Sequence, residues 1–416
     1  MPSAILTSAM SSKMVPPKRD SATALTRLHS TSQMKSKPSL AAALAACIVA
    51  LATPWAHAET PEKPSQTTAE PTAEPPKKPS QTAPEPSAEQ APAAKAMKSG
   101  PLAAAAAVMP GLVIHGFGHY VAGDKKTAMR LLAWQGVGLG LMVASGSTIA
   151  LTGASRYGNE LTIPLLITGT GIFLNTAYAD IYGSATGGRA PRYATPPEFT
   201  VTAGYGYIDD PQFDYTHFSV VSASYIRGTI GLTPSLWTAL DADNQRARLP
   251  LRYRLLDNRA GDFLELGTAL TYHRYGDDGF TSTVGELSIG GRINSSQLGA
   301  SLAGSFSSAT LGYALHRTSY DVDDVSSDTI ALLIARFGYG LYLPKGGELE
   351  GYYQHRRDGY TAGLSPSPRN GSGFLGHFGI ALRQPISDRF AVALRTEIGS
   401  AWVSTAGLEF RAGSTK

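Results

Sequence analysis

The sequence predicts a mainly β protein, namely an antiparallel transmembrane β-barrel of about twelve strands preceded by an α-helical hairpin and a disordered Pro/Ala-rich linker. Apolar and polar side chains alternate almost throughout from Pro196 to Arg411, in segments of about ten residues separated by turn residues. Aromatic residues recur at the ends of these segments, where a barrel meets the edges of the bilayer. Two long apolar stretches within residues 101–190 predict the helices.

The alternation is clearest in the last two predicted strands, which span residues 388–411. In the first of them, Phe390 lies on the apolar face, whereas Arg395 and Glu397 lie on the polar face. The second strand repeats the pattern and carries Phe410 at the end of its apolar face. A side-chain period of two with one apolar face indicates a strand with two different surroundings.

The number of strands follows from the connections between them. Thirteen segments alternate, whereas single-chain bacterial barrels have an even number of strands. With both chain ends on the periplasmic side, the longer connections should be external. In a count of thirteen, Ser319–Asp328 and Asp358–Gly371 fall on the wrong side. If one strand between Thr283 and Thr318 is removed, both connections fall on the external side. Twelve strands is therefore the first choice and fourteen the second.

The polar faces of the strands carry charges of both signs, which predicts a narrow polar lumen. The candidate lumen-facing residues are Arg248, Arg252, Arg254, Glu265, Arg383, Arg389, Arg395 and Glu397. In a soluble β-sandwich, the polar face would instead meet solvent and the apolar face would form the core. The aromatic strand ends and the frequent small residues favour the barrel.

With these alternating segments and a late aromatic, residues 191–416 resemble the class of bacterial outer-membrane β-barrel proteins. The resemblance implies an outer-membrane location, contact with membrane lipids and insertion by the outer-membrane assembly machinery. Members of this class usually end on an aromatic residue that the machinery reads. Phe410 occupies that role here, although Arg411–Lys416 follows it.

The N-terminal part predicts an exported chain. Residues 1–33 are a polar upstream extension, and residues 34–58 have the basic start, the apolar run and the Ala-His-Ala cleavage site of a signal peptide. As an alternative, the residues ending at Cys47 resemble a lipoprotein signal box, in which Cys47 would be lipidated. Residues 59–100 contain almost no apolar residue larger than alanine, which predicts a disordered linker.

Composition excludes several functions. The chain has 416 residues and a formal net charge of +4, and its basic residues are mixed with acidic ones, which predicts no nucleic-acid binding. Its single cysteine, Cys47, lies in the predicted signal peptide, so the mature chain would hold neither a disulfide nor a thiolate metal site. Composition leaves the oligomeric state open.

Residues 101–190 form the predicted helical segment. Thr127–Leu151 and Leu161–Tyr178 are apolar over lengths close to that needed to cross a bilayer, and a polar turn at Asn159 and Glu160 makes them a hairpin. The glycine-rich residues ahead of them, Pro110–Asp124, resemble the Pro-Gly-x-Gly-x-x-Tyr-x-Gly motif that opens small two-helix bacterial membrane domains. That resemblance covers about residues 109–150.

The same motif contains the candidates for metal binding, His115, His119 and Asp124. The two histidines are four residues apart, which is the spacing of a helical metal pair. The surrounding glycines and Pro110 favour a turn rather than a regular helix, and the sequence contains no HExxH motif. We therefore predict a glycine-rich turn with interfacial histidines, and neither a metal nor another cofactor.

No motif identifies a catalytic centre. Some outer-membrane barrels are lipid hydrolases with a Ser–His pair on the outer wall, and the candidate bases here are His217, His273, His316, His355 and His377. An aspartate cluster at 321–328 lacks the glycine and glutamate of a calcium-binding EF-hand loop. No phosphate-binding loop or dinucleotide fingerprint is present.

Three functions therefore remain. The first is an exported outer-membrane barrel with a structural role or a role in passing small solutes. The second is an outer-membrane lipid-modifying hydrolase, for which His377 is an example of a base. The third is an inner-membrane anchored protein whose periplasmic β domain acts as an interaction module, because helices this apolar tend to be retained in the inner membrane.

Overall fold

The computed structural model describes residues 100–152, 156–191, 193, 196–211, 213–258, 261–321, 326–356, 359–361 and 376–413. The predicted upstream extension, signal peptide and almost all of the linker lie outside the described residues, as do Cys47 and part of the aspartate cluster.

Within the described residues, four helices precede the sheet: α2 (Pro101–Val108), α3 (Phe117–Val121), α4 (Lys125–Thr152) and α5 (Arg156–Thr186). The hairpin of α4 and α5 confirms the prediction, and both helices contain stretches long and apolar enough to cross a membrane. Helix α5 runs eight residues past the predicted end at Tyr178. The last turns contain buried polar residues, among them Asp180 and Ser184, so the apolar pattern ends before the helix does.

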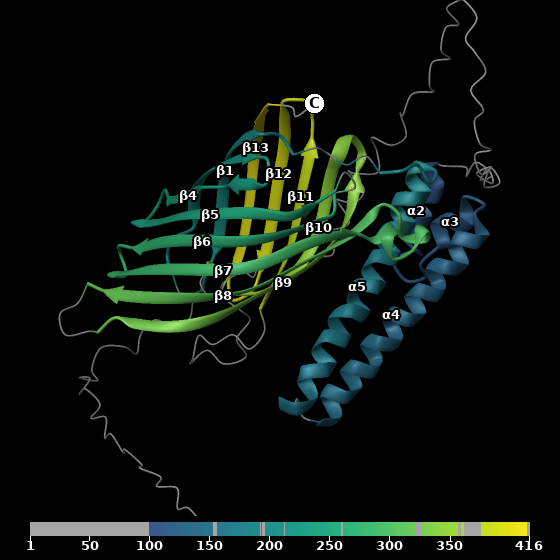
Figure 1. Ribbon diagram of the computed structural model, residues 1–416, viewed down its shortest axis with the longest axis horizontal. Helices are drawn as coiled ribbons and strands as arrows, with labels where there is room; N and C mark the ends of the chain where they lie inside the picture. The colour runs from purple at the N-terminus through teal and green to yellow at the C-terminus, as the bar shows by residue number, and fades with distance from the viewer. Residues whose placement is uncertain are drawn as a thin grey trace, which may run out of the picture. The chain divides into compact units, whose positions relative to one another are not determined.

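The rest of the described chain forms one antiparallel sheet. Its strands are β1 (Phe199–Asp209), β2 (His217–Arg227), β3 (Ile230–Leu232), β4 (Ser235–Ala239), β5 (Asn244–Asp257), β6 (Phe263–Tyr275), β7 (Phe280–Asn294), β8 (Ser305–Tyr320), β9 (Asp328–Leu343), β10 (Gly347–His355), β11 (His377–Pro385), β12 (Phe390–Ile398) and β13 (Trp402–Ala412). The last strand pairs with the first, from Phe199 opposite Ala412 to Asp209 opposite Trp402, which closes the sheet into a barrel (Figure 1).

The thirteen strand labels correspond to twelve strand positions. Strands β3 and β4 both lie between β2 and β5 and together form one position, interrupted at Thr233 and Pro234. Proline has no N–H to donate to the ladder, which accounts for the interruption. The first-choice prediction of twelve strands is therefore confirmed.

The superfluous predicted strand lies between Thr283 and Thr318, at Leu298–Phe306. Most of this segment is the connection between β7 and β8 and contains two short 3-10 helices, η2 (Ser295–Gln297) and η3 (Ala300–Leu302). Its apolar residues alternate for a different reason, because Leu302 is buried against Leu131 of α4 and Ala179 of α5. The prediction of a strand there was wrong, since a two-residue period cannot distinguish a strand from a connection that packs against helices.

The barrel wall has the opposite polarity to that of a soluble protein. Leu287 is 66% exposed, whereas its neighbour Glu286, which points inward, is only 8% exposed. The same contrast recurs on other strands, where outward leucines are exposed and inward carboxylates are buried. An apolar outer band around a polar interior is the arrangement of a barrel that spans a bacterial outer membrane. The soluble-sandwich alternative, and with it the inner-membrane anchored β domain, is therefore wrong.

Helix α5 lies against the outer wall of this barrel, near the end at which β1 begins and β13 ends. The Asn175 side chain donates a 2.8 Å hydrogen bond from Nδ2 to the Ser307 hydroxyl of β8. Ser307 precedes the inward-facing Ser308, so it points outward. The helical hairpin is thus attached to the wall of the barrel rather than inserted in its lumen.

Candidate functional site

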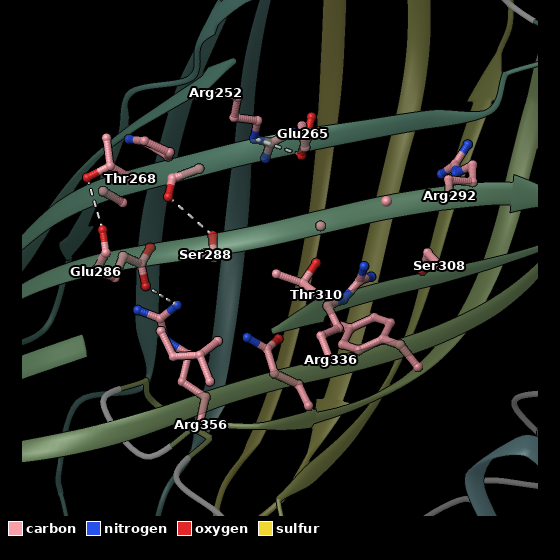
Figure 2. A pocket seen from close by; sticks show the side chains of 18 of the residues that line it. Arg252, Glu265, Thr268, Glu286, Ser288, Arg292, Ser308, Thr310, Arg336 and Arg356 are labelled. Atoms are coloured by element: carbon pink, nitrogen blue, oxygen red, sulfur yellow. Dashed lines mark hydrogen bonds and ion pairs between the residues drawn. The ribbon is translucent and has the colours of Figure 1, made fainter. Parts of the chain in front are cut away.

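The candidate site is the charged interior of the barrel. A cavity of about 420 Å³ lies inside it, and a single water needs roughly 10–15 Å³ of such space. Charged residues of both signs line the cavity, with arginine in excess: Arg248, Arg252, Arg292, Arg336, Arg356 and Arg395, against Glu265, Glu286 and Glu350. Figure 2 shows many of these side chains projecting from the strands into one common space.

Several ion pairs cross the interior instead of joining neighbouring strands. Arg292 of β7 contacts Glu348 of β10 at 2.8 Å, although two strands separate them. Arg383 of β11 likewise contacts Glu409 of β13 at 2.5 Å across β12. Such pairs occupy part of the lumen and tie together strands that are two or three positions apart in the wall.

Glu286 is the most enclosed of these carboxylates at the cavity. It bonds Arg248 of β5 on one side, and its second oxygen lies 2.8 Å from Arg356, which follows β10. Glu350 accepts hydrogen bonds from Arg336 at 2.7 Å and from the Ser308 hydroxyl at 2.5 Å. Buried carboxylates are tolerated when they are paired and hydrogen-bonded in this way.

A second polar group involves Tyr352 of β10 and two residues of β12. The Tyr352 hydroxyl donates to Glu397 at 2.6 Å and accepts from the Nε of Arg395 at 2.7 Å. Arg395 also pairs directly with Glu397, and His377 Nε2 of β11 lies 3.5 Å from the same carboxylate. These contacts connect three strands on one side of the lumen.

Aromatic side chains occupy the end of the barrel opposite the start of β1 and the end of β13, which is the external end in this fold. This aromatic cluster comprises Phe213, Tyr215, Phe218, Trp237, Tyr275 and Tyr360, and its ring centroids lie 5.1 to 6.5 Å apart in successive contacts. The Tyr360 hydroxyl, from the β10–β11 connection, donates to Asn244 at 2.9 Å. Burial, with nearby Tyr275 and Asp210, raises the pKa of Tyr215 well above its usual range, so it remains a neutral hydroxyl.

The periplasmic end is narrowed by a smaller group of rings. Tyr342 of β9 packs edge-on against Tyr193 with centroids 5.0 Å apart, and it lies at the same distance from Phe306 of β8. The Arg292 guanidinium is 4.1 Å from the centroid of Phe306. The cavity therefore lies between aromatic groups at both ends.

The predicted lumen residues occupy several environments. Arg248, Arg252, Glu265 and Arg395 line the cavity. Arg383 and Glu397 form the ion pairs given above, and Arg254 pairs with Asp257 at 2.6 Å. Arg389 lies in the exposed turn between β11 and β12, away from the cavity.

The alternation pattern missed Arg356, Glu350 and Tyr352. Arg356 comes after the end of β10, where a two-residue period no longer specifies a direction. The other two lie on β10 itself, in which the spacing of Glu348, Glu350 and Tyr352 was an available signal for an inward face. The aromatic cluster could not be found in this way, because it unites residues from connections and strands distant in the sequence.

The two histidines of the glycine-rich motif belong to a separate polar group in the helical segment. The buried carboxylate of Asp180 in α5 accepts the backbone N–H groups of Gly116 at 2.9 Å and His119 at 3.0 Å, and its Oδ1 lies 2.7 Å from His119 Nδ1. His115 Nδ1 lies 2.6 Å from the Thr176 hydroxyl. The group attaches the motif to α5.

Asp124 does not join the two histidines. Its carboxylate accepts the N–H of Thr127 at 3.0 Å and caps the start of α4. Although burial opposes the shift, the hydroxyl and N–H of Thr127 lower the pKa of Asp124. Within the described part of the chain, no three His, Cys, Asp or Glu side chains are grouped so that they could hold a metal ion.

The five histidines considered as catalytic bases are dispersed. On the inner side of the barrel, His273 Nε2 lies 3.0 Å from Asn244 Oδ1, and His316 Nε2 lies 3.0 Å from the Ser282 hydroxyl. His377 is also inside, beside Glu397. His217 contacts the Tyr205 hydroxyl at 2.5 Å and His355 contacts that of Tyr353 at 3.3 Å, both on the outer side. The Ser282–His316 pair faces the interior, whereas a lipid substrate would approach the outer wall.

No protein-family model and no curated protein sequence matches the chain. It is similar in structure to the KdgM porin in complex with disordered oligogalacturonate, over 51% of this chain and 99% of that one, at 10% identity and a TM-score of 0.35. The NanC porin aligns over 51% of this chain and 100% of its own chain, at 8% identity and a TM-score of 0.32. An outer-membrane channel from Pseudomonas putida F1 aligns over 54% of this chain and 98% of its own, at 13% identity and a TM-score of 0.33. Similarity at this level says nothing about a substrate.

Proposed function

We propose that the barrel is a narrow channel for small polar solutes, which the aromatic cluster closes at the external end in the conformation described. The observation that carries this proposal is the polar cavity inside the closed sheet. A barrel of about eight strands is just wide enough for side chains to fill its interior, and a barrel with more strands is wider. Here the interior retains about 420 Å³ lined by arginine and glutamate, which is room for a hydrated solute.

The aromatic cluster supplies a reason for closure. Tyr215 and Tyr360 are both buried, and their rings lie 5.6 Å apart at the external end. Both come from connections rather than from strands, so they can be displaced without breaking the ladder of the barrel. Passage of a solute would require that displacement.

The test is conductance of the purified, folded chain in planar lipid bilayers. We expect low or rare conductance for the wild type and a clear increase for Tyr360→Ala, because this substitution removes a ring from the centre of the cluster. Tyr313→Ala is the matched control, since Tyr313 lies on β8 and is 54% exposed on the outer wall. If neither the wild type nor Tyr360→Ala conducts, the barrel has a structural role instead.

We also infer that residues 34–58 direct export and that residues 59–100 link the signal peptide to the helices. The basic residues Lys35 and Lys37, followed by an apolar run, support this inference. The N-terminal sequence of the protein isolated from outer membranes tests it. A start at Glu59 agrees with ordinary cleavage, whereas a lipidated Cys47 at the N-terminus would show lipoprotein processing.

A further inference from the structure

We infer that Arg246, Arg248 and Arg356 form a binding site for a small oxyanion that bears carboxylate or phosphate groups. The inference deepens the proposed channel function by naming the class of solute. It also stands as a binding site if the barrel does not conduct.

Positive charge exceeds negative charge at this place in the barrel. Arg246 and Arg248 are two residues apart on β5, so both side chains point into the barrel, and Arg356 reaches the same place from the end of β10. Glu286 is the carboxylate that they share. Among the residues that the structure describes and whose ion pairs are given above, three guanidinium groups face one carboxylate, which leaves a local excess of positive charge.

Elsewhere among the described lumen residues, the positive excess is smaller. Arg292 pairs with Glu348 and Arg336 with Glu350, and at Glu409 two arginines, Arg383 and Arg411, share one carboxylate. Among the described residues, Arg246 forms no ion pair with a carboxylate. It instead lies with its guanidinium carbon 5.8 Å from the centroid of the Tyr360 ring.

The charged side chains at this place are buried. The side chains of Arg356 and Glu286 are only 9% and 5% exposed, so water compensates little of their charge. Removing charges from water is unfavourable unless opposite charges and hydrogen bonds replace the lost hydration. Glu286 is the carboxylate that Arg248 and Arg356 share among the described residues, and a bound anion would supply further negative charge beside Arg246 and Arg248.

Arginine N–H donors remain available at this place. The Nε groups of Arg246 and Arg248 are buried and have no hydrogen-bond partner in the part of the chain that the structure describes. A guanidinium group presents its N–H donors in a planar fork that matches the two oxygens of a carboxylate or phosphate. An oxyanion between these two arginines would accept from both.

The position of the site suits a solute on its way through the barrel. Arg248, Glu286 and Arg356 line the cavity, and Arg246 lies beneath the ring of Tyr360 in the aromatic cluster. Figure 2 shows Glu286 and Arg356 facing each other at one end of the cavity. A small dianion there would neutralise the excess charge just inside the closed external end.

The test is calorimetric titration of the detergent-solubilised full chain at low salt, with inorganic phosphate in one arm and sodium succinate in the other. We expect one ion to bind per chain in at least one arm. Binding in both arms indicates a general oxyanion site, and binding in one arm identifies the group that it prefers. If neither anion binds to the wild type, the inference is wrong.

Two variants and a matched control locate the binding. Arg246→Gln and Arg248→Gln should each weaken binding by about tenfold or more, the effect expected when a charge-assisted hydrogen bond is lost. Arg252→Gln is the control, because it removes the same charge from β5 at the same cavity but contacts Glu265 instead of Glu286. Equal weakening by Arg252→Gln would overturn the assignment of the site.

Heat-dependent mobility on an SDS gel checks that each variant is folded. If Arg248→Gln does not fold, Arg246→Gln still tests the inference, since its side chain has no ion pair to break within the described residues. Binding without conductance in bilayers would leave the anion site in place and contradict the channel. Conductance without anion binding would support the channel and contradict the anion site.

Discussion

The Tyr339 hydroxyl, on the outer face of β9, donates a 2.8 Å hydrogen bond to the Ile167 carbonyl of α5. The same ring fills the space beside Gly171, one helical turn further along α5, where a side chain would have no room. The helical hairpin is therefore attached to the barrel wall through a hydrogen bond and a close helix–ring contact. The wall therefore covers part of the apolar surface of α5.

Substitution of Gly171 should separate the helix from the wall. Gly171→Leu would force the side chain into the Tyr339 ring, at a cost of about 1–3 kcal/mol for overpacking. Cysteines at Asn175 and Ser307, whose side chains are hydrogen-bonded at 2.8 Å, report contact by forming a cross-link. We expect the cross-link in the parent chain and its loss with Gly171→Leu. Gly140→Leu in α4 is the control, since no atom lies within 4 Å of its added carbon, and the prediction fails if both variants cross-link equally.

Loss of the Asp180 carboxylate should detach the glycine-rich motif from α5. Asp180→Ala leaves the N–H groups of Gly116, Gly118 and His119 without their acceptor, which should cost about 3–5 kcal/mol of local stability. Hydrogen exchange of residues 115–121 measures the effect, and it should accelerate strongly. Ser184→Ala is the control, because that hydroxyl bonds only carbonyls of its own helix, and unchanged exchange in Asp180→Ala would contradict the expected role of the carboxylate.

Glu286 should contribute more to barrel stability than Glu265. Glu286→Gln breaks a buried ion pair shared with Arg248 and Arg356, at an expected cost of about 3–5 kcal/mol. Glu265→Gln should cost no more than about 1 kcal/mol, because its oxygen is 3.8 Å from Arg252, whose side chain is half exposed. Urea unfolding in detergent micelles compares the two, and equal losses would show that burial does not set the strength of these pairs.

The external β6–β7 connection should be less stable at neutral than at acidic pH. Burial, followed by repulsion from Asp277 and Asp214, raises the pKa of Asp278. A carboxyl whose pKa is raised on folding favours the folded state below its unfolded pKa of about 3.9, and this contribution is lost as the pH rises through the folded pKa. The melting temperature of Asp278→Asn should therefore match that of the wild type at low pH and exceed it increasingly above about pH 4. A constant difference at every pH would exclude titration of Asp278 as the cause.

Phe410 offers a test of assembly. Phe410 and Phe390 are paired on the outer face of neighbouring strands with ring centroids 5.6 Å apart, and they are 39% and 38% exposed. Because either substitution by alanine removes the same contact, their stability losses should be similar. If the assembly machinery reads Phe410, Phe410→Ala alone should lower the yield of folded protein in the outer membrane, whereas purified chains of both variants should refold alike. Equal yields in cells would remove Phe410 from that role.

Local sequence determined most of the barrel. The alternation of outward leucines with inward charges follows from the geometry of a strand, so the faces of β5, β12 and β13 could be read residue by residue. The expectation that longer connections lie on the external side also identified the superfluous strand, although Leu298, Ala300 and Leu302 alternate as the residues of a strand do. The length and composition of α4 and α5 likewise predicted the hairpin.

Only the tertiary structure decided which charges meet. Glu286 and Arg356 are 70 positions apart in the printed sequence, one in the middle of β7 and the other just after β10, so no periodicity connects them. The same holds for Asp180 beneath the glycine-rich motif and for Tyr360 in the aromatic cluster. Strand geometry assigns a direction to each side chain, whereas contact across the lumen depends on closure of the sheet. The curvature of the closed sheet brings β7 and β10 within reach of each other. The inward polar faces of the strands then enclose a charged cavity.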